Sequence, residues 1–205
     1  RSIEDPVTSH RANVDATLLL LSAARQAKVR RFVFASSSSV YGNSPTLPKH
    51  EQMSPNPISP YALQKLIGEK YSCLFHALYE LDTVALRFFN VFGPRQDPCS
   101  PYSGVISLFT AALSEGRQPV IHGDGEQTRD FTYVSDVADG VLAAATAPGV
   151  AGMTMNLARG GCISLNRLFE ILREIIGISV DPVYGPPRAG DVRDSQADSA
   201  LAKKH

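Results

Sequence analysis

The sequence has no tryptophan, no excess charge of either sign and no long apolar run. Its 20 Lys and Arg residues balance 20 Asp and Glu residues, so electrostatics give no reason to expect nucleic acid or a charged membrane surface as a partner. The longest apolar run, residues 16–21, is interrupted by Thr17 and is far shorter than the roughly 20 residues of a membrane-spanning helix. We therefore expect small molecules, or copies of the chain, as partners.

Cysteine is also scarce, with only three residues in the chain. Cys73, Cys99 and Cys162 are odd in number, far apart and without metal-ligand spacing, which supports neither a disulfide framework nor a zinc site. A reducing compartment suits such a chain, and no signal sequence is visible, so we expect a cytoplasmic protein. The chain begins with Arg1 and not with Met, from which we expect that upstream residues are missing.

What the sequence does contain is a pattern typical of an α/β fold. Its 205 residues, 43% of them hydrophobic, are enough for the core of one domain or slightly more. The Ala-rich pattern over 7–28 predicts a helix, and the almost wholly apolar run 31–35 predicts a strand that is covered on both faces. A helix that leads into a buried strand favours a parallel sheet.

Local signals predict the remaining elements. Ser59 and Pro60 are typical of a helix N-cap and first helical residue, so we expect a helix over 61–80. We expect Ser135 and Ser164 to cap two further helices, which end near residues 147 and 176. The other expected elements are a helix over 105–115, strands over 83–89, 119–122 and 153–157, an extended segment over 131–134 and an irregular one over 182–187.

A run of four serines, 36–39, directly follows the predicted strand at 31–35. Ligands of open parallel sheets bind at the carboxyl ends of the strands, so these hydroxyls are candidates for a binding site. The alternative is a serine-rich turn whose hydroxyls satisfy their own backbone.

Tyr61 and Lys65 are four residues apart on a predicted helix and so share one face. An ammonium near a phenol favours the phenolate, so we expect Lys65 to lower the pKa of Tyr61 toward the range of a general base. An ordinary exposed pair on a helix surface is the alternative interpretation.

Two arginines lie in predicted loops, Arg129 after a glycine turn at 123–125 and Arg188 near the C-terminus. Guanidinium groups suit phosphate oxygens, so the two could hold a diphosphate. Surface salt bridges are an equally weighted alternative for each. The five histidines have no spacing typical of a ligand set, and no metal is expected.

Five segments, in the same order along the chain, resemble one known family. They are FVFASSSSVYG at 32–42, SPYALQK at 59–65, LRFFNVFGPR at 86–95, GDGEQTRDFTYVSDV at 123–137 and RAGD at 188–191. The chain thus resembles the extended short-chain dehydrogenase/reductases, and among them the NAD-dependent nucleotide-sugar epimerases and dehydratases, with UDP-glucose and UDP-N-acetylglucosamine 4-epimerases the most similar.

The resemblance implies a Rossmann-like, doubly wound parallel sheet with a small C-terminal α/β substrate-binding domain. The family's glycine-rich phosphate loop would precede the serines by about 100 residues, yet the first glycine is Gly42, so we expect an incomplete sheet without that loop or its first strands. Residues 1–95 would be the later part of the NAD-binding domain. Residues 96–205 would mainly bind the UDP-sugar, with 119–147 returning to the Rossmann sheet.

The resemblance also implies an isomerase that epimerises a UDP-hexose at C4 through a 4-keto intermediate, with NAD as a cofactor that stays bound. Tyr61 would remove the proton of the C4 hydroxyl while hydride passes to NAD, Ser37 would share the hydrogen bond to that oxygen, and Lys65 would hold the nicotinamide ribose. The expected NAD contacts are Asn13, Ala35, Ser36, Tyr61, Lys65 and Phe89. The expected UDP-sugar contacts are Ser37, Ser38, Tyr61, Asn90, Val105, Leu108, Val120, His122, Arg129, Arg188, Asp191 and Ser195. The small Ser195 would leave room for an N-acetyl group at C2.

Several alternatives stay open. The 4,6-dehydratases and decarboxylases of the family carry acidic residues where this chain has Ser38 and Ser39, whereas UDP-glucuronate 4-epimerases have a similar serine run. A non-catalytic nucleotide-sugar-binding protein is the alternative from another class, and we expect this chain alone to be inactive. The family also implies a homodimer through the helices at 13–28 and 61–80. The apolar stripe that would form this interface consists of Leu18, Leu21, Leu66, Cys73 and Leu74. The stripe could equally be core within one chain.

Overall fold

A three-stranded parallel sheet with the order β1-β2-β7 forms the centre of the computed structural model, which describes residues 2–100, 103–187 and 192–205. The strands are β1 (Phe32–Ser37), β2 (Thr83–Phe88) and β7 (Thr154–Leu157). The expected parallel sheet is therefore confirmed, with fewer strands than a complete Rossmann sheet.

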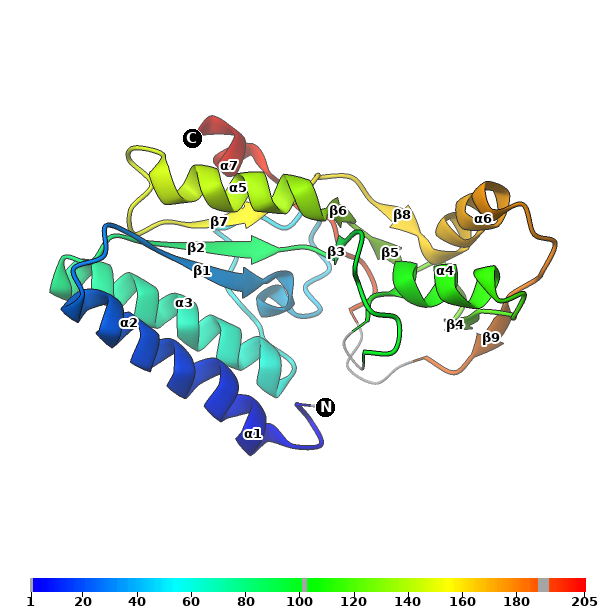
Figure 1. Ribbon diagram of the computed structural model, residues 1–205, viewed down its shortest axis with the longest axis horizontal. Coiled ribbons are helices and arrows are strands. Elements are labelled where there is room, and N and C mark those ends of the chain that lie inside the picture. The colour runs from blue at the N-terminus through cyan, green and yellow to red at the C-terminus, as the bar shows by residue number, and fades with distance from the viewer. Residues whose placement is uncertain (1, 101–102, 188–191) are drawn as a thin grey trace.

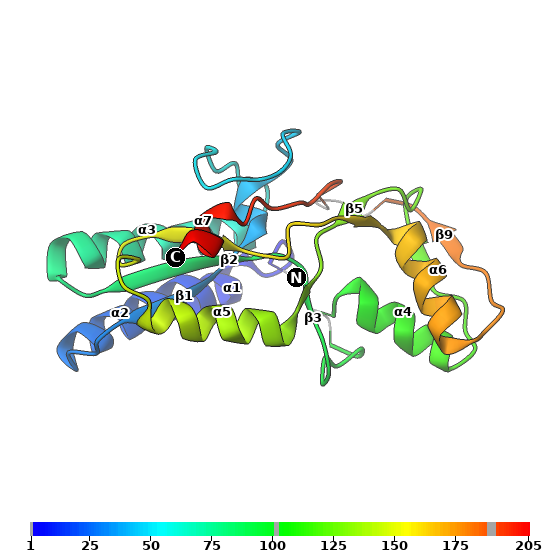
Figure 2. The same cartoon turned by 90° about the horizontal axis from the view of Figure 1, so that it is seen from above.

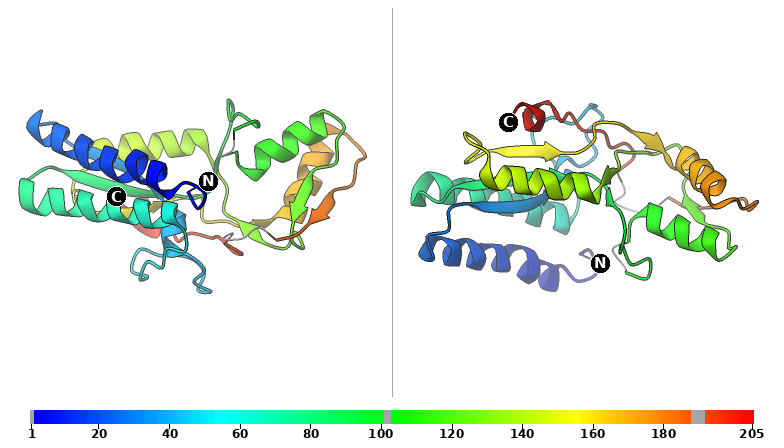
Figure 3. Two further views of the ribbon diagram at one scale, coloured as in Figure 1. Left: turned by 90° about the horizontal axis from the view of Figure 1, so that it is seen from below. Right: turned by 45° about the horizontal axis from the view of Figure 1, so that its top comes forward.

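Helices cover both faces of this sheet (Figure 1). α2 (Ala16–Gln26) and α3 (Pro60–Tyr79) lie side by side below one face, as Figure 3 shows from below. α5 (Val134–Thr146) and the short α7 (Ala200–Lys204) lie on the other face. We call this sheet with its four helices the sheet half.

The helix expected at 7–28 is interrupted by a π-helical turn. α1 (Pro6–His10) leads into the π-helix η1 (Arg11–Asp15), which continues directly into α2. Such a turn inserts one extra residue and is frequent at functional sites.

α3 begins where the sequence predicts. The Ser59 Oγ accepts a hydrogen bond of 3.2 Å from the backbone N–H of Ala62, and Pro60 is the first helical residue. The helix lies unusually close to β1 at Gly68, where an added Cβ would come within 2.3 Å of the Phe34 ring. A glycine at this position therefore lets α3 approach the strand that carries the four serines.

The remaining elements form a smaller distal half that extends away from the sheet (Figure 2). α4 (Val105–Ser114) and α6 (Leu165–Ile176) pack against each other there. Their shared core is apolar, and its buried members are Phe109, Leu113, Ile121, Leu165, Leu168 and Phe169. Short strand pairs complete this half, namely β4 (Val120–His122) with β9 (Val183–Gly185) and β5 (Thr128–Arg129) with β8 (Ile163–Ser164). The pair of β3 (Val91–Phe92) with β6 (Thr132–Tyr133) lies between the two halves. The 3₁₀-helix η2 (Ser38–Tyr41) directly follows β1.

Two local expectations are wrong. Ser135 does not cap α5, which begins at Val134 without a side-chain cap, whereas Ser164 caps α6 as expected, through a 3.2 Å bond from Arg167 N. The proline-flanked segment 182–187 contains a strand, β9, because its backbone pairs with β4. Within the segment 119–147, β4 pairs with β9, whereas the helix α5 packs on the larger sheet.

The apolar stripe expected on the outer face of α2 and α3 is divided between core and surface. Leu21 is fully buried and packs with Phe75 inside the chain, and Leu18 and Leu66 are partly buried. Leu74 is exposed, as are neighbours outside the expected stripe, namely Leu19, Leu20 and Leu78. No helix in the described part of the chain is both long and apolar enough to span a membrane.

Candidate active site

The carboxyl end of β1 and the first turn of α3 bring together three of the expected catalytic side chains. Ser37 ends β1, where its Oγ accepts a bond of 3.2 Å from Ser39 N and so caps η2. Tyr61 lies in the first turn of α3, with its phenol close enough to the Ser37 hydroxyl for the two groups to interact. Lys65 follows one turn later, with its Nζ 5.6 Å from the centroid of the Tyr61 ring.

The electrostatics of Tyr61 differ from the sequence-based expectation. Burial raises the pKa of the Tyr61 phenol above its ordinary value, and the hydrogen bond with Ser37 acts in the opposite direction. The expected lowering by Lys65 is thus wrong for the structure described here, because loss of solvent is the dominant effect on a half-buried phenol.

Lys65 is held by the strand as well as by its helix. Its Nζ donates a hydrogen bond of 3.0 Å to the backbone carbonyl of Ala35 and lies 5.3 Å from the centroid of the Phe34 ring. Burial lowers the pKa of the Lys65 ammonium. The Ala35 carbonyl therefore positions this lysine beside Tyr61.

The other residues expected near a dinucleotide lie around the same corner but are turned into the protein. Ser36 is buried, and its Oγ donates a bond of 2.5 Å to the Glu69 carboxylate, so it offers a ligand its backbone only. Phe89 is fully buried in a cluster with Val40. Asn13 lies in the π-helical turn that packs on α3, and its Nδ2 donates to Ser9 O at 2.9 Å.

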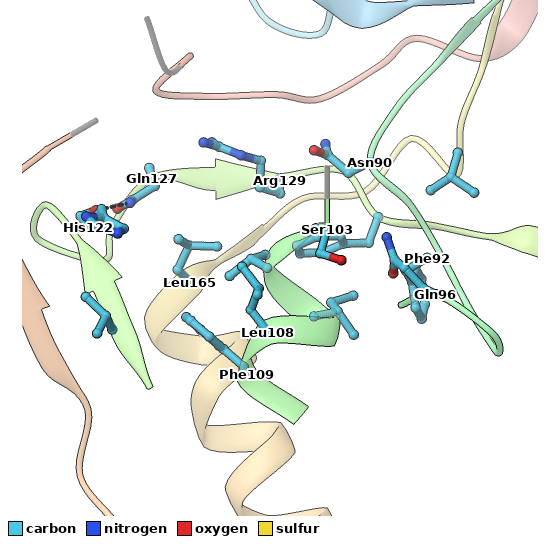
Figure 4. A pocket seen from close by; sticks show the side chains of 16 residues that line it. Asn90, Phe92, Gln96, Ser103, Leu108, Phe109, His122, Gln127, Arg129 and Leu165 are labelled. Carbon is cyan, nitrogen blue, oxygen red and sulfur yellow. Dashed lines mark hydrogen bonds between the residues drawn. The ribbon is translucent and has the colours of Figure 1, made fainter. Parts of the chain in front are cut away.

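A cavity of about 230 Å³ opens in the distal half between α4, β4 and β5 (Figure 4). Its apolar floor is made by side chains such as Leu108, Phe109 and Leu165, and its upper wall carries Asn90 and Arg129. Six of the residues expected to bind a UDP-sugar line this cavity, namely Asn90, Val105, Leu108, Val120, His122 and Arg129.

Backbone contacts fix the polar wall of this distal cavity. The Arg129 Nη1 donates to the carbonyls of Thr128 at 2.8 Å and Arg193 at 2.9 Å. His122 Nδ1 lies 3.0 Å from the Pro186 carbonyl oxygen, and Gln127 Nε2 donates to His122 O at 2.5 Å (Figure 4). No side chain caps the first turn of α4, which also lines the cavity.

A second cavity of about 290 Å³ lies between the serine run and the chain segment that follows residue 191. Ser37, Ser38 and Ser195 line it, and so do Asn90 and Arg129, which it shares with the distal cavity. Asn90 has a positive φ of 26°, and its Nδ2 donates to Asp130 O at 3.1 Å and to Ser195 Oγ at 3.4 Å. The two cavities thus adjoin at Asn90 and Arg129, and we call the second one the central cavity.

Sequence reasoning missed two charged residues of the central cavity, Lys49 and Asp194. Lys49 is almost fully buried, and its Nζ donates to the carbonyls of Ser44 and Thr46. Burial lowers the pKa of the Lys49 ammonium, and the nearby Asp194 carboxylate opposes that shift. Lys49 lies in a proline-rich loop with no regular spacing to Asp194, so no local signal could identify them. Two expected substrate contacts, Arg188 and Asp191, lie outside the described residues.

The comparison with known proteins agrees with this geometry. The model of the NAD dependent epimerase/dehydratase family matches residues 1–158. A UDP-glucose 4-epimerase of Mycolicibacterium smegmatis is 40% identical over 205 residues, which are 100% of this chain and 65% of that protein.

Solved structures of similar proteins have the same fold. A UDP-N-acetylglucosamine 4-epimerase of Methanobrevibacter ruminantium, solved with UDP-N-acetylmuramic acid, has a TM-score of 0.95 at 42% identity and covers 99% of this chain and 65% of its own. A UDP-glucose 4-epimerase of Thermotoga maritima, solved with UDP-glucose, has a TM-score of 0.95 at 38% identity, with the same coverage of 99% and 65%. The fold is therefore that of the Rossmann-type epimerases, of whose length the chain spans about two thirds. The 205 residues belong to the NAD dependent epimerase/dehydratase family.

Proposed function

We propose that this chain carries the catalytic and sugar-nucleotide-binding part of an NAD-dependent UDP-hexose 4-epimerase. One observation carries the proposal: Ser37, Tyr61 and Lys65 converge at the end of β1, and Ser37 lines a cavity that shares Asn90 and Arg129 with the distal cavity. A hydroxyl, a phenol and an ammonium side by side can take a proton from a sugar hydroxyl and return it.

The residues present fit one end of NAD. Lys65, anchored to the Ala35 carbonyl beside Tyr61, can donate hydrogen bonds to the ribose next to the nicotinamide. The chain has no glycine before Gly42 and so no glycine-rich loop ahead of β1 for the phosphates. When bound, NAD accepts a hydride from the sugar and gives it back.

In this proposal Tyr61 exchanges the proton of the C4 hydroxyl of the sugar, and Ser37 hydrogen-bonds the same oxygen. Burial raises the pKa of the Tyr61 phenol, so in the state described here the hydroxyl is protonated and can donate a hydrogen bond to the C4 oxygen. A bound sugar in the central cavity would contact Ser37, Ser38 and Ser195, which line it.

We place the nucleotide in the distal cavity. Its apolar floor with a few polar side chains on one wall is typical of small-molecule sites. The N-terminus of α4 and the Arg129 guanidinium both favour a negative charge, as a diphosphate would supply at the junction of the two cavities. Residues 1–95 would thus serve the cofactor and chemistry, and residues 96–205 mainly the UDP-sugar.

We further propose that the protein is a homodimer through α2 and α3. Leu19, Leu20 and Leu78 expose 59–70% of their surface on these helices, and an apolar hollow between the two helices contains Leu74 and Tyr79. Such clustered exposed apolar side chains are typical of protein interfaces. The three cysteines are free and exposed, which supports the reducing cytoplasm as its compartment.

The test is turnover of the complete protein with UDP-glucose, UDP-N-acetylglucosamine and UDP-glucuronate, with identification of the products. We expect C4 epimers of at least one UDP-hexose, and Tyr61→Phe to reduce turnover about 100-fold or more while UDP-sugar affinity persists. Product from UDP-glucuronate alone would assign the chain to the UDP-glucuronate 4-epimerases instead. Unchanged turnover of Tyr61→Phe would exclude Tyr61 as the acid/base.

A further inference from the structure

Three buried polar residues lie in one row across the sheet, directly behind the candidate active site. Ser36 in β1 is in register with Arg87 in β2, which is in register with Asn156 in β7. Their side chains belong to residues that are at most 4% exposed. A polar row in the interior is unusual, because buried polar groups cost free energy unless hydrogen bonds satisfy them.

Glu69 of α3 joins two members of this row. Its Oε1 accepts bonds from Ser36 Oγ at 2.5 Å and from Arg87 Nε at 2.8 Å, and its Oε2 accepts one from Arg87 Nη2 at 2.7 Å. Burial alone would lower the pKa of Arg87, but the hydrogen bonds and charge of Glu69 raise it. The Arg87 guanidinium therefore stays charged, and the salt-bridged pair is enclosed, with Glu69 at 3% and Arg87 at 4% exposure.

The network continues to the wall of the central cavity. The Arg87 guanidinium lies 4.7 Å from the centroid of the Tyr41 ring, and the Tyr41 hydroxyl donates to Asn156 Oδ1 at 2.7 Å. Asn156 Nδ2 in turn donates to the Lys49 carbonyl at 2.9 Å. One connected set of contacts thus ties β1, α3, β2, η2 and β7 together.

The placement of Glu69 on its helix gives this network a use. Tyr61, Lys65 and Glu69 follow one another at four-residue spacing, so they lie along one face of α3. Each contacts one of the last three residues of β1: the Tyr61 phenol interacts with the Ser37 hydroxyl, the Lys65 ammonium donates to the Ala35 carbonyl, and the Glu69 carboxylate accepts from the Ser36 hydroxyl between them. Of these three contacts, the one between Glu69 and Ser36 involves no side chain that acts in the proposed proton exchange.

We propose that Glu69 is a positioning residue, which through the Ser36 hydroxyl holds the end of β1 in place so that Ser37 and Ala35 keep their contacts to Tyr61 and Lys65. This inference rests on the proposed function, in which Tyr61 and Lys65 act on the sugar. Arg87 fixes the Glu69 carboxylate by two parallel hydrogen bonds, a geometry that restricts rotation more than a single bond would.

A purely structural role predicts something different. A buried ion pair is weak evidence for stability, since apolar residues of similar volume are often neutral or stabilising in its place. If Glu69 and Arg87 only fill space, their joint replacement leaves the contacts of Tyr61 unchanged. If Glu69 positions the end of β1, the same replacement loosens the bond between Ser37 and Tyr61.

The first experiment measures the titration of Tyr61 in this chain, by NMR of ring-labelled tyrosine, with Tyr61→Phe to assign the signal. The Ser37 bond lowers the pKa of Tyr61, so in Ser36→Ala we expect that pKa to rise. Ser36→Thr keeps the hydroxyl and should restore the wild-type titration. The matched control is Ser72→Ala, which removes a buried hydroxyl of α3 that donates to Gly68 O at 2.9 Å.

The double variant Glu69→Leu/Arg87→Met tests Glu69 itself without leaving a buried charge unpaired. We expect the same upward shift of the Tyr61 pKa in it. In the complete protein we expect kcat of Ser36→Ala to fall about tenfold with KM within about twofold, since misplacement of a reacting group affects the chemical step.

An unchanged Tyr61 titration in Ser36→Ala, or an equal shift in Ser72→Ala, would overturn the positioning role. If the double variant does not fold, the titrations of Ser36→Ala, Ser36→Thr and the control Ser72→Ala decide the question. The titration needs neither substrate nor cofactor. A titration that contradicts the positioning role is therefore distinguishable from failure of the proposed function, which the turnover of Tyr61→Phe tests.

Discussion

The sheet half and the distal half fill their interiors in different ways. Behind β1 the sheet half buries a salt-bridged pair, Glu69 and Arg87, together with serine, tyrosine and asparagine side chains. The distal half packs α4 against α6 through a wholly apolar cluster, and polar side chains such as His122 and Arg129 line its cavity.

This difference matches the work that each half does in the proposed function. Proton exchange needs side chains fixed within fractions of an ångström, and hydrogen bonds in a buried network impose direction as well as distance. Recognition of a nucleotide needs shape and a few polar groups on a stable support, which apolar packing supplies. Substitutions in the hydrogen-bonded network of the sheet half and in the apolar cluster of the distal half therefore test this difference.

The largest effect on stability is expected from Arg87→Met in the sheet half. Without the guanidinium, the buried Glu69 carboxylate loses two of its three hydrogen bonds and its counter-charge. We expect the free energy of unfolding, measured by urea denaturation, to fall by about 4 kcal/mol. Adding Glu69→Leu should recover most of that loss, and a double variant as unstable as Arg87→Met would contradict the argument.

The next largest effect is expected from Leu168→Ala in the distal half. Leu168 is buried on α6 in the apolar cluster with Phe109 and Phe169. Truncation leaves a cavity, so we expect the free energy of unfolding to fall by about 3 kcal/mol. Ile175→Ala, at a position of the same helix that is 75% exposed, is the control and should change stability by less than about 0.5 kcal/mol. Leu168→Ala leaves no charge unpaired, so no second substitution should rescue it in the way that Glu69→Leu is expected to rescue Arg87→Met.

A smaller effect is expected at Ser195, which lines the central cavity between the halves. Tyrosine there would fill space that an N-acetyl group needs, so Ser195→Tyr should reduce kcat/KM of the complete protein for UDP-N-acetylglucosamine about tenfold, or about 1.4 kcal/mol, and spare UDP-glucose. The equally small Ser195→Ala should keep both activities. An equal loss with both substrates in Ser195→Tyr would mean that Ser195 does not select the substituent at C2.

The smallest effect concerns Asp130, between β5 and β6 where the halves meet. Its Oδ2 accepts from Gly160 N at 3.1 Å and Ala197 N at 3.0 Å, whereas its Oδ1 has no hydrogen-bond partner among the described residues. Burial raises the pKa of Asp130 above 3.8, and the backbone N–H groups oppose this shift. The folded state thus binds the Asp130 proton more tightly than the unfolded state. Stability is therefore lost as the pH rises from the pKa of Asp130 in the unfolded state through its higher pKa in the folded state.

Asp130→Asn removes this titration. We expect the stability of the variant relative to wild type to rise by no more than about 1 kcal/mol from pH 3.5 to pH 7, in urea denaturation at a series of pH values. The comparison between the two proteins cancels the contribution of other acids. A relative stability that falls with pH would show that the N–H groups outweigh burial at this carboxylate.

Much of the sheet half follows from local signals in the sequence. Ser59 and Pro60 predict the start of α3, and four-residue spacing places Tyr61 and Lys65 on one face of it. Strands β1 and β2 are apolar enough to be recognised individually.

What the sequence does not reveal depends on contacts between distant segments. The strand β9 forms because its backbone pairs with β4, more than sixty residues earlier, although its proline flanks are typical of a loop. The direction of the Tyr61 pKa depends on burial, which spacing does not specify. Glu69 and Arg87 are 18 residues apart on different elements, so no periodicity pairs them.

The close approach of α3 to β1 at Gly68 has a consequence for how this sequence can change by mutation. Any substitution at Gly68 alone brings a Cβ to 2.3 Å from the tip of the Phe34 ring, so either the ring or α3, the helix that carries Tyr61 and Lys65, must shift. A smaller residue at position 34 would have to be present first. Positions 34 and 68 are therefore expected to covary in descendants of this sequence, with a larger residue at 68 found only beside a smaller one at 34.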